Sequence, residues 1–491
     1  MKRLLLALNI AIALCLSAIG SASFAQQGAP QPAPGQGGAA PPGAPRDGAP
    51  RVRLPGVSLQ ISLGSLFALG APRGDEAFEP GQLLVMWNDE ASARDGLLLL
   101  EQRGLRPLQS QSLAELGTVL ALYQLADYRA ARALRDELRA QQPLWTIDLN
   151  ARAWPLQREA NGVAANVNAV SAAGARLYAR QLLGVDDTAP TSSTTRLGVI
   201  DGSIDGSLLA PAAARVWNGS QIASHSVLAS TDTAAGPAHG TAVALLMAAA
   251  PLANGFAGAA PALHIAWAGA LRKLGAHDSS NSWLLAQAFN WLLGERVQLV
   301  NVSLGGAGDE VLRAVTARVL TKGVAVLAAA GNSADTASVY PGAYPGVWAV
   351  TAIDAAGQPY RHATRAQHVA FAAPGVDVWV PDAAALLAAM LQGASASASA
   401  SASVPAAQAV SGRYLSGTSF ATALASAALA RMPAAFWQLD ADTRKSRLCA
   451  AARAPLQGVV PGGVPGEAPL GCGSLRVDAA AAASALSAKL P

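Results

Sequence analysis

The sequence predicts an α/β fold: a three-layer domain built on a mainly parallel sheet, preceded by a small α+β domain. Two observations support this prediction. From about residue 178, continuously apolar runs alternate with helical runs, and such strands belong to parallel sheets that helices cover on both faces. Between residues 77 and 150, a shorter set of strand and helix patterns precedes that region. The length of 491 residues leaves room for both domains.

The first 25 residues have the pattern of a secretory signal peptide. Lys2-Arg3 supply the positive charge, residues 4–19 the apolar stretch, and Ser23-Phe24-Ala25 a cleavage site with small residues. A permanent membrane anchor is the alternative, and the small and polar residues that follow at once disfavour it. We therefore expect export to the periplasm or the medium, with no stable membrane span after signal removal.

Residues 26–76 are rich in Pro, Gly and Ala and predict a disordered segment. The small domain, 77–150, follows, and a polar, alanine-rich connector spans 151–177, where proteolytic nicking is expected. The large domain covers 178–488. In the small domain we predict strands at 82–86, 118–125 and 145–149 and helices at 91–104 and 128–140.

In the large domain, the predicted strands are 197–200, 263–266, 299–303, 325–329 and 348–352, and the predicted helices are 242–250, 283–293 and 311–321. The uncharged stretch 241–270 is interrupted by prolines and polar residues, so it predicts a buried helix and strand and not a membrane span. The alternating Ala and Ser of 394–403 predict a solvated loop.

The net charge bears on binding partners, and the cysteine content bears on disulfide formation. The formal net charge of +4 is small and scattered, which indicates no nucleic-acid partner. Only Cys449 and Cys472 remain after signal removal. In an exported chain this pair favours one disulfide, with two free buried thiols as the alternative.

Four segments carry candidate chemistry. Ser419 lies on a Gly-Thr-Ser turn that opens an alanine-rich helix, which would expose its hydroxyl and aim its own N–H outward, where it can stabilise an oxyanion. Asp201 ends a predicted strand and could accept a hydrogen bond from an imidazole, although it could also simply cap the turn, and Asp205 is a rival. His239 opens an apolar helix. Asn332 follows Gly331 after a strand and could donate to an oxyanion or form a turn.

Together, in the chain order Asp, His, Asn, Ser, these segments resemble the subtilisin-like serine peptidases, or subtilases, for which this order is known. The resemblance implies a catalytic triad of Asp201, His239 and Ser419 and an oxyanion hole formed by Asn332 and the Ser419 N–H. It also implies two walls of a substrate cleft, composed of Ser303, Leu304, Gly305 and Gly306 on one side and Ala329, Ala330 and Gly331 on the other.

The chain departs from the family pattern at three places. Gly202-Ser203 replace the usual Ser or Thr followed by Gly, Ala242 replaces a second histidine, and Ala423-Leu424 replace Pro-His. Small residues preserve the first turn, and neither of the other changes removes a proton carrier. Metal binding is a poor alternative role for His239, because no second His or Cys lies at ligand spacing.

The resemblance implies a secreted serine endopeptidase, made as a zymogen, that acts on proteins or peptides through an acyl-enzyme. The small domain is similar to the inhibitory propeptides of subtilases; an unrelated accessory domain is the alternative. The rival function is a catalytically silent, subtilase-like binding or regulatory protein. An α/β-hydrolase is rejected, because it needs G-x-S-x-G and the order Ser, Asp, His. The chemistry requires no cofactor, a structural calcium ion is compatible but not placed, and we expect a monomer.

Overall fold

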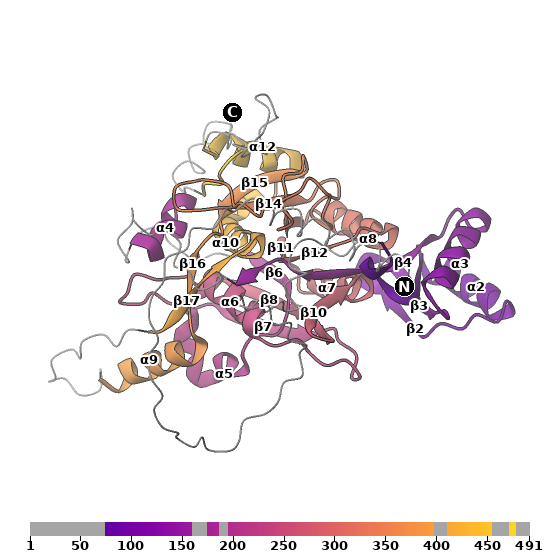
Figure 1. Ribbon diagram of the computed structural model, residues 1–491, viewed down its shortest axis with the longest axis horizontal. Helices are drawn as coiled ribbons and strands as arrows, with labels where there is room; N and C mark the ends of the chain where they lie inside the picture. The colour runs from indigo at the N-terminus through magenta and orange to yellow at the C-terminus, as the bar shows by residue number, and fades with distance from the viewer. Residues whose placement is uncertain (1–73, 160–173, 186–194, 397–409, 454–470, 478–491) are drawn as a thin grey trace, which may run out of the picture. The chain divides into compact units, whose positions relative to one another are not determined.

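The computed structural model of the protein describes residues 74–159, 174–185, 195–396, 410–453 and 471–477 (Figure 1). The predicted signal peptide, nearly all of the segment 26–76 and much of the connector lie outside these residues. The described residues form a small α+β domain followed by a larger domain with a parallel sheet, which confirms the predicted fold class.

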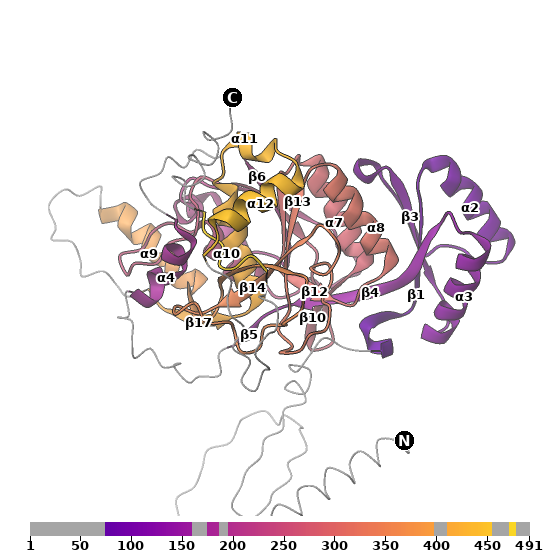
Figure 2. The same cartoon turned by 90° about the horizontal axis from the view of Figure 1, so that it is seen from above.

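The N-terminal domain is an antiparallel sheet with two helices on one face (Figure 2). After a 3-10 turn at Gly74–Ala77, the elements are β1 (Phe78–Trp87), α2 (Glu90–Gln102), β2 (Gln109–Leu113), a 3-10 turn at Ala114–Leu116, β3 (Thr118–Gln124), α3 (Tyr128–Gln141) and β4 (Thr146–Pro155). The strand order is β2-β3-β1-β4. All five predicted elements are present. The strand β2 was not predicted, because it is mostly exposed and its sequence, QSQSL, has almost no apolar residue.

Both faces of this sheet are buried, which explains the unbroken apolar run of β1. Leu83, Val85 and Trp87 pack in the core beneath α2 and α3. Leu84 and Met86 point to the other face and join a second core with residues of α7 (Ser282–Gly294) and α8 (Glu310–Thr321) of the larger domain. The N-terminal domain therefore completes its burial only against the helices of the larger domain.

The larger domain contains a sheet of seven parallel strands in the order β15-β14-β13-β11-β6-β8-β7. Their bounds are β6 (Arg196–Asp201), β7 (Gln221–Ser226), β8 (His264–Gly269), β11 (Leu299–Val302), β13 (Ala325–Ala329), β14 (Trp348–Ile353) and β15 (Val369–Pro374). All five strands predicted for this domain belong to this sheet. The polar and exposed edge strand β7 was not predicted.

Helices cover both faces of the parallel sheet (Figures 1 and 2). The helices α6 (Ala238–Ala248) and α10 (Thr418–Ala430) share a core with Leu197, Val199 and Leu327. On the other face, α7 and α8 pack against Ile200 and Val300. The helix α6 begins four residues before its predicted start, so His239 lies in its first turn.

Shorter elements surround the sheet. Two hairpin strands, β9 (Arg272–Leu274) and β10 (His277–Asn281), precede α7, and β12 (Leu304–Gly306) follows β11. A separate three-stranded sheet has the order β16-β17-β5, with β16 (Val378–Pro381), β17 (Gly412–Ser416) and β5 (Arg158–Glu159). The remaining helices are α4 (Gly174–Leu183), α5 (Gly206–Leu209), the 3-10 helix Pro211–Trp217, α9 (Ala383–Ala396), α11 (Ala434–Trp437) and α12 (Ala441–Ala451). The helix α9 includes the first three residues of the predicted Ala/Ser loop, and the others lie outside the described residues.

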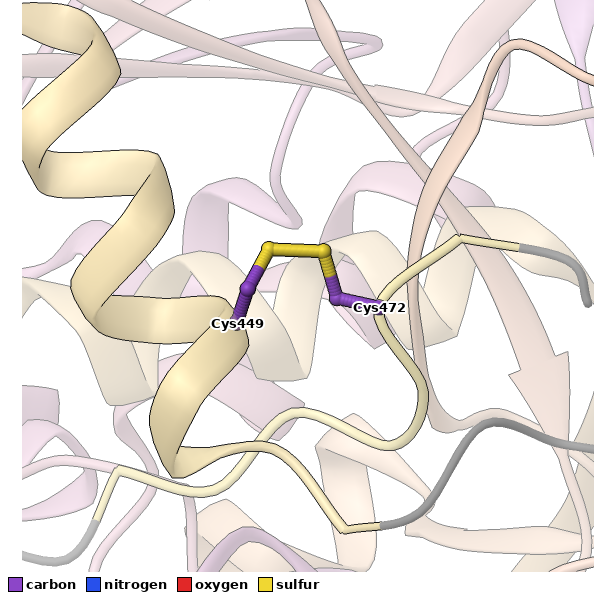
Figure 3. The surroundings of a disulfide bond; sticks show 2 residues. All are labelled: Cys449 and Cys472. Atoms are coloured by element: carbon purple, nitrogen blue, oxygen red, sulfur yellow. A yellow bond between two sulfur atoms is a disulfide. The ribbon is translucent and has the colours of Figure 1, made fainter.

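A disulfide joins Cys449 in α12 to Cys472 (Figure 3). Residues 471–477, which include Cys472, run beside β15. The Cys472 N–H donates to Ala370 O at 2.9 Å, and the Leu475 N–H donates to Ala372 O at 2.8 Å. The bond therefore fastens this C-terminal segment to α12. Within the described part of the chain, no helix combines the length and the apolar character that crossing a bilayer requires.

We expect Cys449 and Cys472 to be bridged in the exported protein. The bond closes a loop with a sequence separation of 23 residues. In the chain-entropy model such a loop contributes about 3 kcal/mol to the free energy of unfolding. The Cys449→Ser, Cys472→Ser double variant should lose about that much in denaturant unfolding. Two titratable thiols in denatured, unreduced wild-type protein would contradict the prediction.

Candidate active site

Asp201 and His239 form a buried hydrogen-bonded pair at the carboxyl end of β6. Asp201 Oδ1 lies 2.7 Å from His239 Nδ1 and accepts the Gly202 N–H at 2.6 Å. Both side chains are buried. A carboxylate at Nδ1 places the proton of a neutral ring on that nitrogen, so Nε2 is left as an acceptor. Among the described residues, Nε2 has no hydrogen-bond partner.

The sequence around this pair fits the close contact between the β6 turn and α6. A Cβ on Gly240 would lie 2.6 Å from Ser203 O, so only glycine allows the helix to approach the turn. Thr241 Oγ1 accepts the Asp205 N–H at 2.8 Å. The Asp205 carboxylate itself caps α5 by accepting the Ser207 N–H at 2.9 Å. Asp205 therefore has a structural contact of its own, and the carboxylate that contacts His239 is that of Asp201.

Asn332 and Ser419 converge on one carbonyl oxygen, that of Leu156. Asn332 Nδ2 donates to Leu156 O at 2.6 Å and the Ser419 N–H donates to it at 3.2 Å. The Asn332 amide is oriented by the Thr418 N–H, which donates to its Oδ1 at 3.1 Å. Ser419 is the second residue of α10, where backbone N–H groups have no partner inside the helix. Two donors thus polarise the Leu156 carbonyl.

Leu156 is held there because the chain before it runs between two strands of the larger domain. On one side β4 pairs antiparallel with β12, in the register Leu304↔Pro155, Gly305↔Trp154 and Gly306↔Ala153. On the other side it pairs antiparallel with β10, with Ser280 opposite Ala153. A Cβ on Gly306 would overlap the carbonyl oxygen of Arg152, so this glycine permits the close approach.

Beyond Leu156 the chain continues through the site without a break. In β5, Arg158 pairs with Ser416 and Glu159 pairs with Leu415 of β17, the strand that leads into α10. The backbone is therefore fixed on both sides of the bond between Leu156 and Gln157. An extended segment with main-chain pairing on both sides has the geometry of a peptide bound by strand addition.

The hydroxyl of Ser419 is buried, whereas the sequence predicted an exposed one. Its Oγ donates to Ser303 O at 2.7 Å and accepts the Leu156 N–H at 2.9 Å. Leu156 contacts it, and no local pattern in the sequence predicts this long-range contact. The Oγ proton is directed to Ser303 and not to His239.

The predicted cleft residues divide into two groups. Ser303, Leu304, Gly305 and Gly306 contact the chain from Arg152 to Leu156, through the pairing above and the contacts of Ser303. Ala329 ends β13 and Ala330 packs in the core with Ala349 and Val369, and both are fully buried. Their role as a cleft wall remains a prediction. Gly331 adopts φ +115°, where a side chain would also overlap Thr364.

Ion pairs to one buried carboxylate hold β4 in place. Glu79 of β1 is almost fully buried and pairs with Arg152 of β4, Nη2 to Oε2, at 3.1 Å. It also pairs with Arg272 of β9 and accepts from Asn281 Nδ2 at 3.2 Å. One carboxylate thus links both domains, and removing it would leave two half-buried guanidinium groups without this partner.

The N-terminal ends of α7 and α8 also face β4. Asn150 Oδ1 accepts the Trp283 N–H at 3.1 Å, and Asp148 Oδ2 accepts the Glu310 N–H at 2.9 Å. Asp309 caps α8 by accepting the Leu312 N–H at 2.8 Å and also accepts from the Ser282 hydroxyl. Burial is the main cause that raises the pKa of Asp309 to about 7, and the nearby Asp148 carboxylate acts in the same direction.

The segment 152–159 is the part of the site that the sequence reasoning missed. It was assigned to the beginning of a polar connector, although Ala153-Trp154-Pro155-Leu156 is an apolar run of four. That run was a signal that this part of the connector is buried.

In the portion of the chain that the structure describes, no group of three or more His, Cys, Asp or Glu side chains could hold a metal ion.

The sequence of this chain matches a known protein family. The profile of the Subtilase family matches residues 163–469, more than half of the chain. The chain belongs to the subtilase family. The small domain precedes the matched region, and the four residues Asp201, His239, Asn332 and Ser419 lie within it.

Similarity to curated subtilases covers a part of the chain. A thermostable alkaline protease of Halalkalibacterium halodurans is 33% identical over 141 residues, which are 28% of this chain and 38% of that protein. Subtilisin of Bacillus pumilus is 31% identical over 148 residues, 29% of this chain and 53% of that protein. The matches thus span about two fifths to one half of these relatives.

A solved structure has a similar fold over most of the chain. Fervidolysin from Fervidobacterium pennivorans, described as a keratinolytic enzyme related to subtilisin, superposes with a TM-score of 0.58 at 18% sequence identity. The superposition covers 84% of this chain and 62% of that structure. At this identity the likeness concerns the fold.

The raised pKa of Asp309 predicts a pH dependence of stability. The folded protein holds a proton on Asp309 up to about pH 7, whereas the unfolded chain loses it near pH 4. The contribution of this group to stability is therefore complete below about pH 4 and is lost as the pH rises through about 7. Asp309→Asn keeps an oxygen to accept the Leu312 N–H and removes the titration.

The measurement is denaturant unfolding of the uncleaved Ser419→Ala protein, with and without Asp309→Asn. We expect the stability of the protein that retains Asp309, relative to the protein with the Asp309→Asn substitution, to fall between about pH 4.5 and about pH 7.5, at a slope no steeper than about 1.4 kcal/mol per pH unit. A stability difference that stays constant across this range would show that Asp309 titrates normally.

Proposed function

We propose that the protein is an exported serine endopeptidase, made as a zymogen, that cleaves peptide bonds through a triad of Asp201, His239 and Ser419. One observation carries the proposal: the Leu156 carbonyl lies between Asn332 Nδ2 and the Ser419 N–H, with the Ser419 hydroxyl against the same residue. This is the arrangement that acyl transfer needs, because both donors face an oxygen on which negative charge would develop.

The proposed reaction begins with a rotation of the serine hydroxyl. The hydrogen bond from Ser419 Oγ to Ser303 O breaks. The hydroxyl then gives its proton to His239 Nε2, the buried acceptor without a partner among the described residues. The oxygen then attacks the substrate carbonyl carbon. Asp201 stabilises the imidazolium that results, since its carboxylate lies 2.7 Å from Nδ1.

The intermediate carries its charge on the former carbonyl oxygen, where Asn332 and the Ser419 N–H donate to it. His239 next protonates the leaving amine, the carbon–nitrogen bond breaks, and an acyl-serine remains. Water, deprotonated by His239, hydrolyses that ester and restores the serine. No step requires a metal or an organic cofactor, and the substrate class is a protein or peptide that can pair with β12 and β10.

The N-terminal domain, in this proposal, inhibits the enzyme in cis and aids its folding. Its strand β4 occupies the cleft, and its sheet shares a core with α7 and α8. A parallel sheet with distant strand pairings folds slowly, because loop-closure entropy is lost before the contacts form. A preformed sheet that covers both helices lowers that cost.

The predicted signal peptide supports export as part of this proposal. The disulfide Cys449–Cys472 fits an oxidising compartment, in which such bonds persist. The rival is a catalytically silent member of the family, and the first experiment below separates the two.

Our first prediction for this function concerns the nucleophile and the oxyanion donor. Ser419→Ala should abolish casein hydrolysis and labelling by a fluorophosphonate, with the fold intact. Asn332→Ala should lower turnover about a hundred- to a thousand-fold, the loss known for one missing oxyanion donor in subtilisin itself. This substitution removes the donor without adding a charge that would repel the oxyanion, although the Thr418 N–H also loses its acceptor, Asn332 Oδ1.

The matched control is Ser426→Ala, seven residues along the same helix, where the hydroxyl donates to Asn301 Oδ1 at 3.1 Å. It should retain activity and labelling. Casein hydrolysis by pure Ser419→Ala protein would exclude Ser419 as the nucleophile. A wild-type protein that folds but is neither active nor labelled would favour the silent alternative.

The second prediction concerns maturation. The bond fixed in the site is Leu156–Gln157, so the mature chain should begin at Gln157, as determined by mass spectrometry of its N-terminal peptide. Ser419→Ala should remain at the size of the signal-cleaved precursor. Because the strand is presented by its own chain, the rate of cleavage should not depend on protein concentration.

Two outcomes would contradict self-cleavage at this bond. One is an identical N-terminus in wild-type and Ser419→Ala proteins. The other is a mature N-terminus that never passes through Gln157, even at early times. A cleavage rate proportional to concentration would replace the intramolecular reaction with an intermolecular one.

A further inference from the structure

Two donors of the larger domain meet at one oxygen atom of the N-terminal domain. The guanidinium of Arg272, on β9, pairs with Glu79 Oε1, and Asn281 Nδ2, at the end of β10, donates to the same oxygen at 3.2 Å. The other oxygen, Glu79 Oε2, lies 3.1 Å from Arg152 Nη2. Only 4% of Glu79 is exposed, so its carboxylate is enclosed together with these donors.

The strand register places these side chains on one face of the sheet. Arg152 of β4 lies opposite Asn281 of β10. Ser279, two residues before Asn281, lies opposite Arg272 of β9. Directly opposed residues, and residues two apart on one strand, point to the same face. A residue at position 152 therefore points its side chain to the face on which Asn281 and Arg272 present their donors.

The larger domain supplies further partners that hold both donors in place. Arg272 Nη1 lies 3.3 Å from Asp232 Oδ1. Asn281 caps α7, because its Oδ1 accepts the Leu284 N–H at 3.0 Å. Neither contact involves the N-terminal domain, so both donors would keep their positions after that domain leaves.

Cleavage at the proposed bond places Glu79 and Arg152 in the fragment that departs. Arg272 and Asn281 then lose the carboxylate that they share. A substrate that pairs with β10 in the register of β4 brings one side chain to the place of Arg152. A cation there would face Arg272 with no carboxylate between them, whereas a carboxylate there could accept from both donors.

We propose that Arg272 and Asn281 form a binding site for an acidic side chain of the substrate, four residues before the residue whose carbonyl is attacked. This inference rests on the proposed peptidase function and adds a charge preference to the substrate class. In the zymogen, Glu79 fills the site from β1 and lies between the guanidinium groups of Arg152 and Arg272. The enzyme thus cleaves its own chain with arginine at that position but selects glutamate there in other substrates.

The test compares peptides of residues 150–159, carrying a fluorophore and a quencher, with the native Arg152, Arg152→Gln or Arg152→Glu. Mature wild-type enzyme, separated from its N-terminal domain, should favour Glu over Gln by about tenfold in kcat/KM, because hydrogen bonds to a charged acceptor are stronger. Gln should in turn exceed Arg, which meets Arg272 as a like charge. Since 19% of the Arg272 side chain is exposed, the ratio of Glu to Gln should fall as the salt concentration rises.

Variants of the larger domain assign this preference to Arg272. Arg272→Gln should bring the ratio of Glu to Gln close to one, and Arg272→Lys, which keeps the charge, should retain part of it. The matched control is Lys273→Gln, which removes a cation from the next residue of β9, where Nζ pairs with Asp278 at 2.9 Å. Adjacent strand residues point to opposite faces, so this change should leave the ratio as it is.

A second substitution covers the case in which Arg272→Gln alone does not mature. Glu79→Gln in the same chain removes the carboxylate that would be left without Arg272. This residue departs with the N-terminal domain, so the mature enzyme still differs from the wild type only at Arg272.

Equal rates for the three peptides, a preference for Arg, or a ratio that Arg272→Gln does not change would overturn this inference and leave the peptidase function standing. If fluorophosphonate labels the enzyme but none of the peptides is cut, the same ratios are measured from the peptide concentrations that protect Ser419 from labelling, with the same contrary outcomes. Absence of both hydrolysis and labelling in every folded protein would overturn the peptidase function as well.

Discussion

The site depends on one strand, β4, which belongs to two sheets at once. Its first half pairs with β1 in the N-terminal domain, and its second half lies between β10 and β12 of the larger domain. Main-chain pairing on both sides fixes where the strand ends. The position of the Leu156 carbonyl beneath Asn332 and Ser419 is a consequence of that register, since a shift by one residue would bring a different carbonyl to the donors.

Burial of both faces of the N-terminal sheet supports the same constraint. Alternate residues of β1 face α2 and α3 or face α7 and α8, so the sheet cannot slide without exposing apolar surface. Polar contacts reinforce the alignment at the edges of this surface. Asn150 and Asp148 accept from the first N–H groups of α7 and α8, which have no partners within their helices.

The sequence predicted the elements whose burial imposes a regular pattern. The strands of the parallel sheet are apolar throughout because helices cover both faces, and the pair of Asp201 and His239 was assigned correctly to neighbouring strand and helix ends. The strands β10 and β12 were missed because they have only three to five residues each, and their form depends on pairing with β9 and β4 more than on their own composition. Propensity does not reveal a strand that depends on its partners.

Leu156 was missed for a related reason. It is an ordinary apolar residue in the connector, and only the fold brings it beside Gly305. The setting of Ser419 in the sequence predicted an exposed hydroxyl, because the turn before α10 is made of small residues. The structure covers that hydroxyl with a segment 263 residues away along the chain. No local pattern records such a contact.

The contacts that present Leu156 for cleavage would also retain it afterwards. Hydrolysis would leave a carboxylate where the carbonyl now lies, and hydrogen bonds from Asn332 and the Ser419 N–H to a charged acceptor are stronger than those to a neutral one. Pairing with β10 and β12 would be unchanged, because it involves residues before the broken bond. Separation of the domains would then require loss of the remaining interface, the Glu79 ion pairs and the core shared with α7 and α8. The proposed zymogen would therefore become active at domain release and not at chain cleavage.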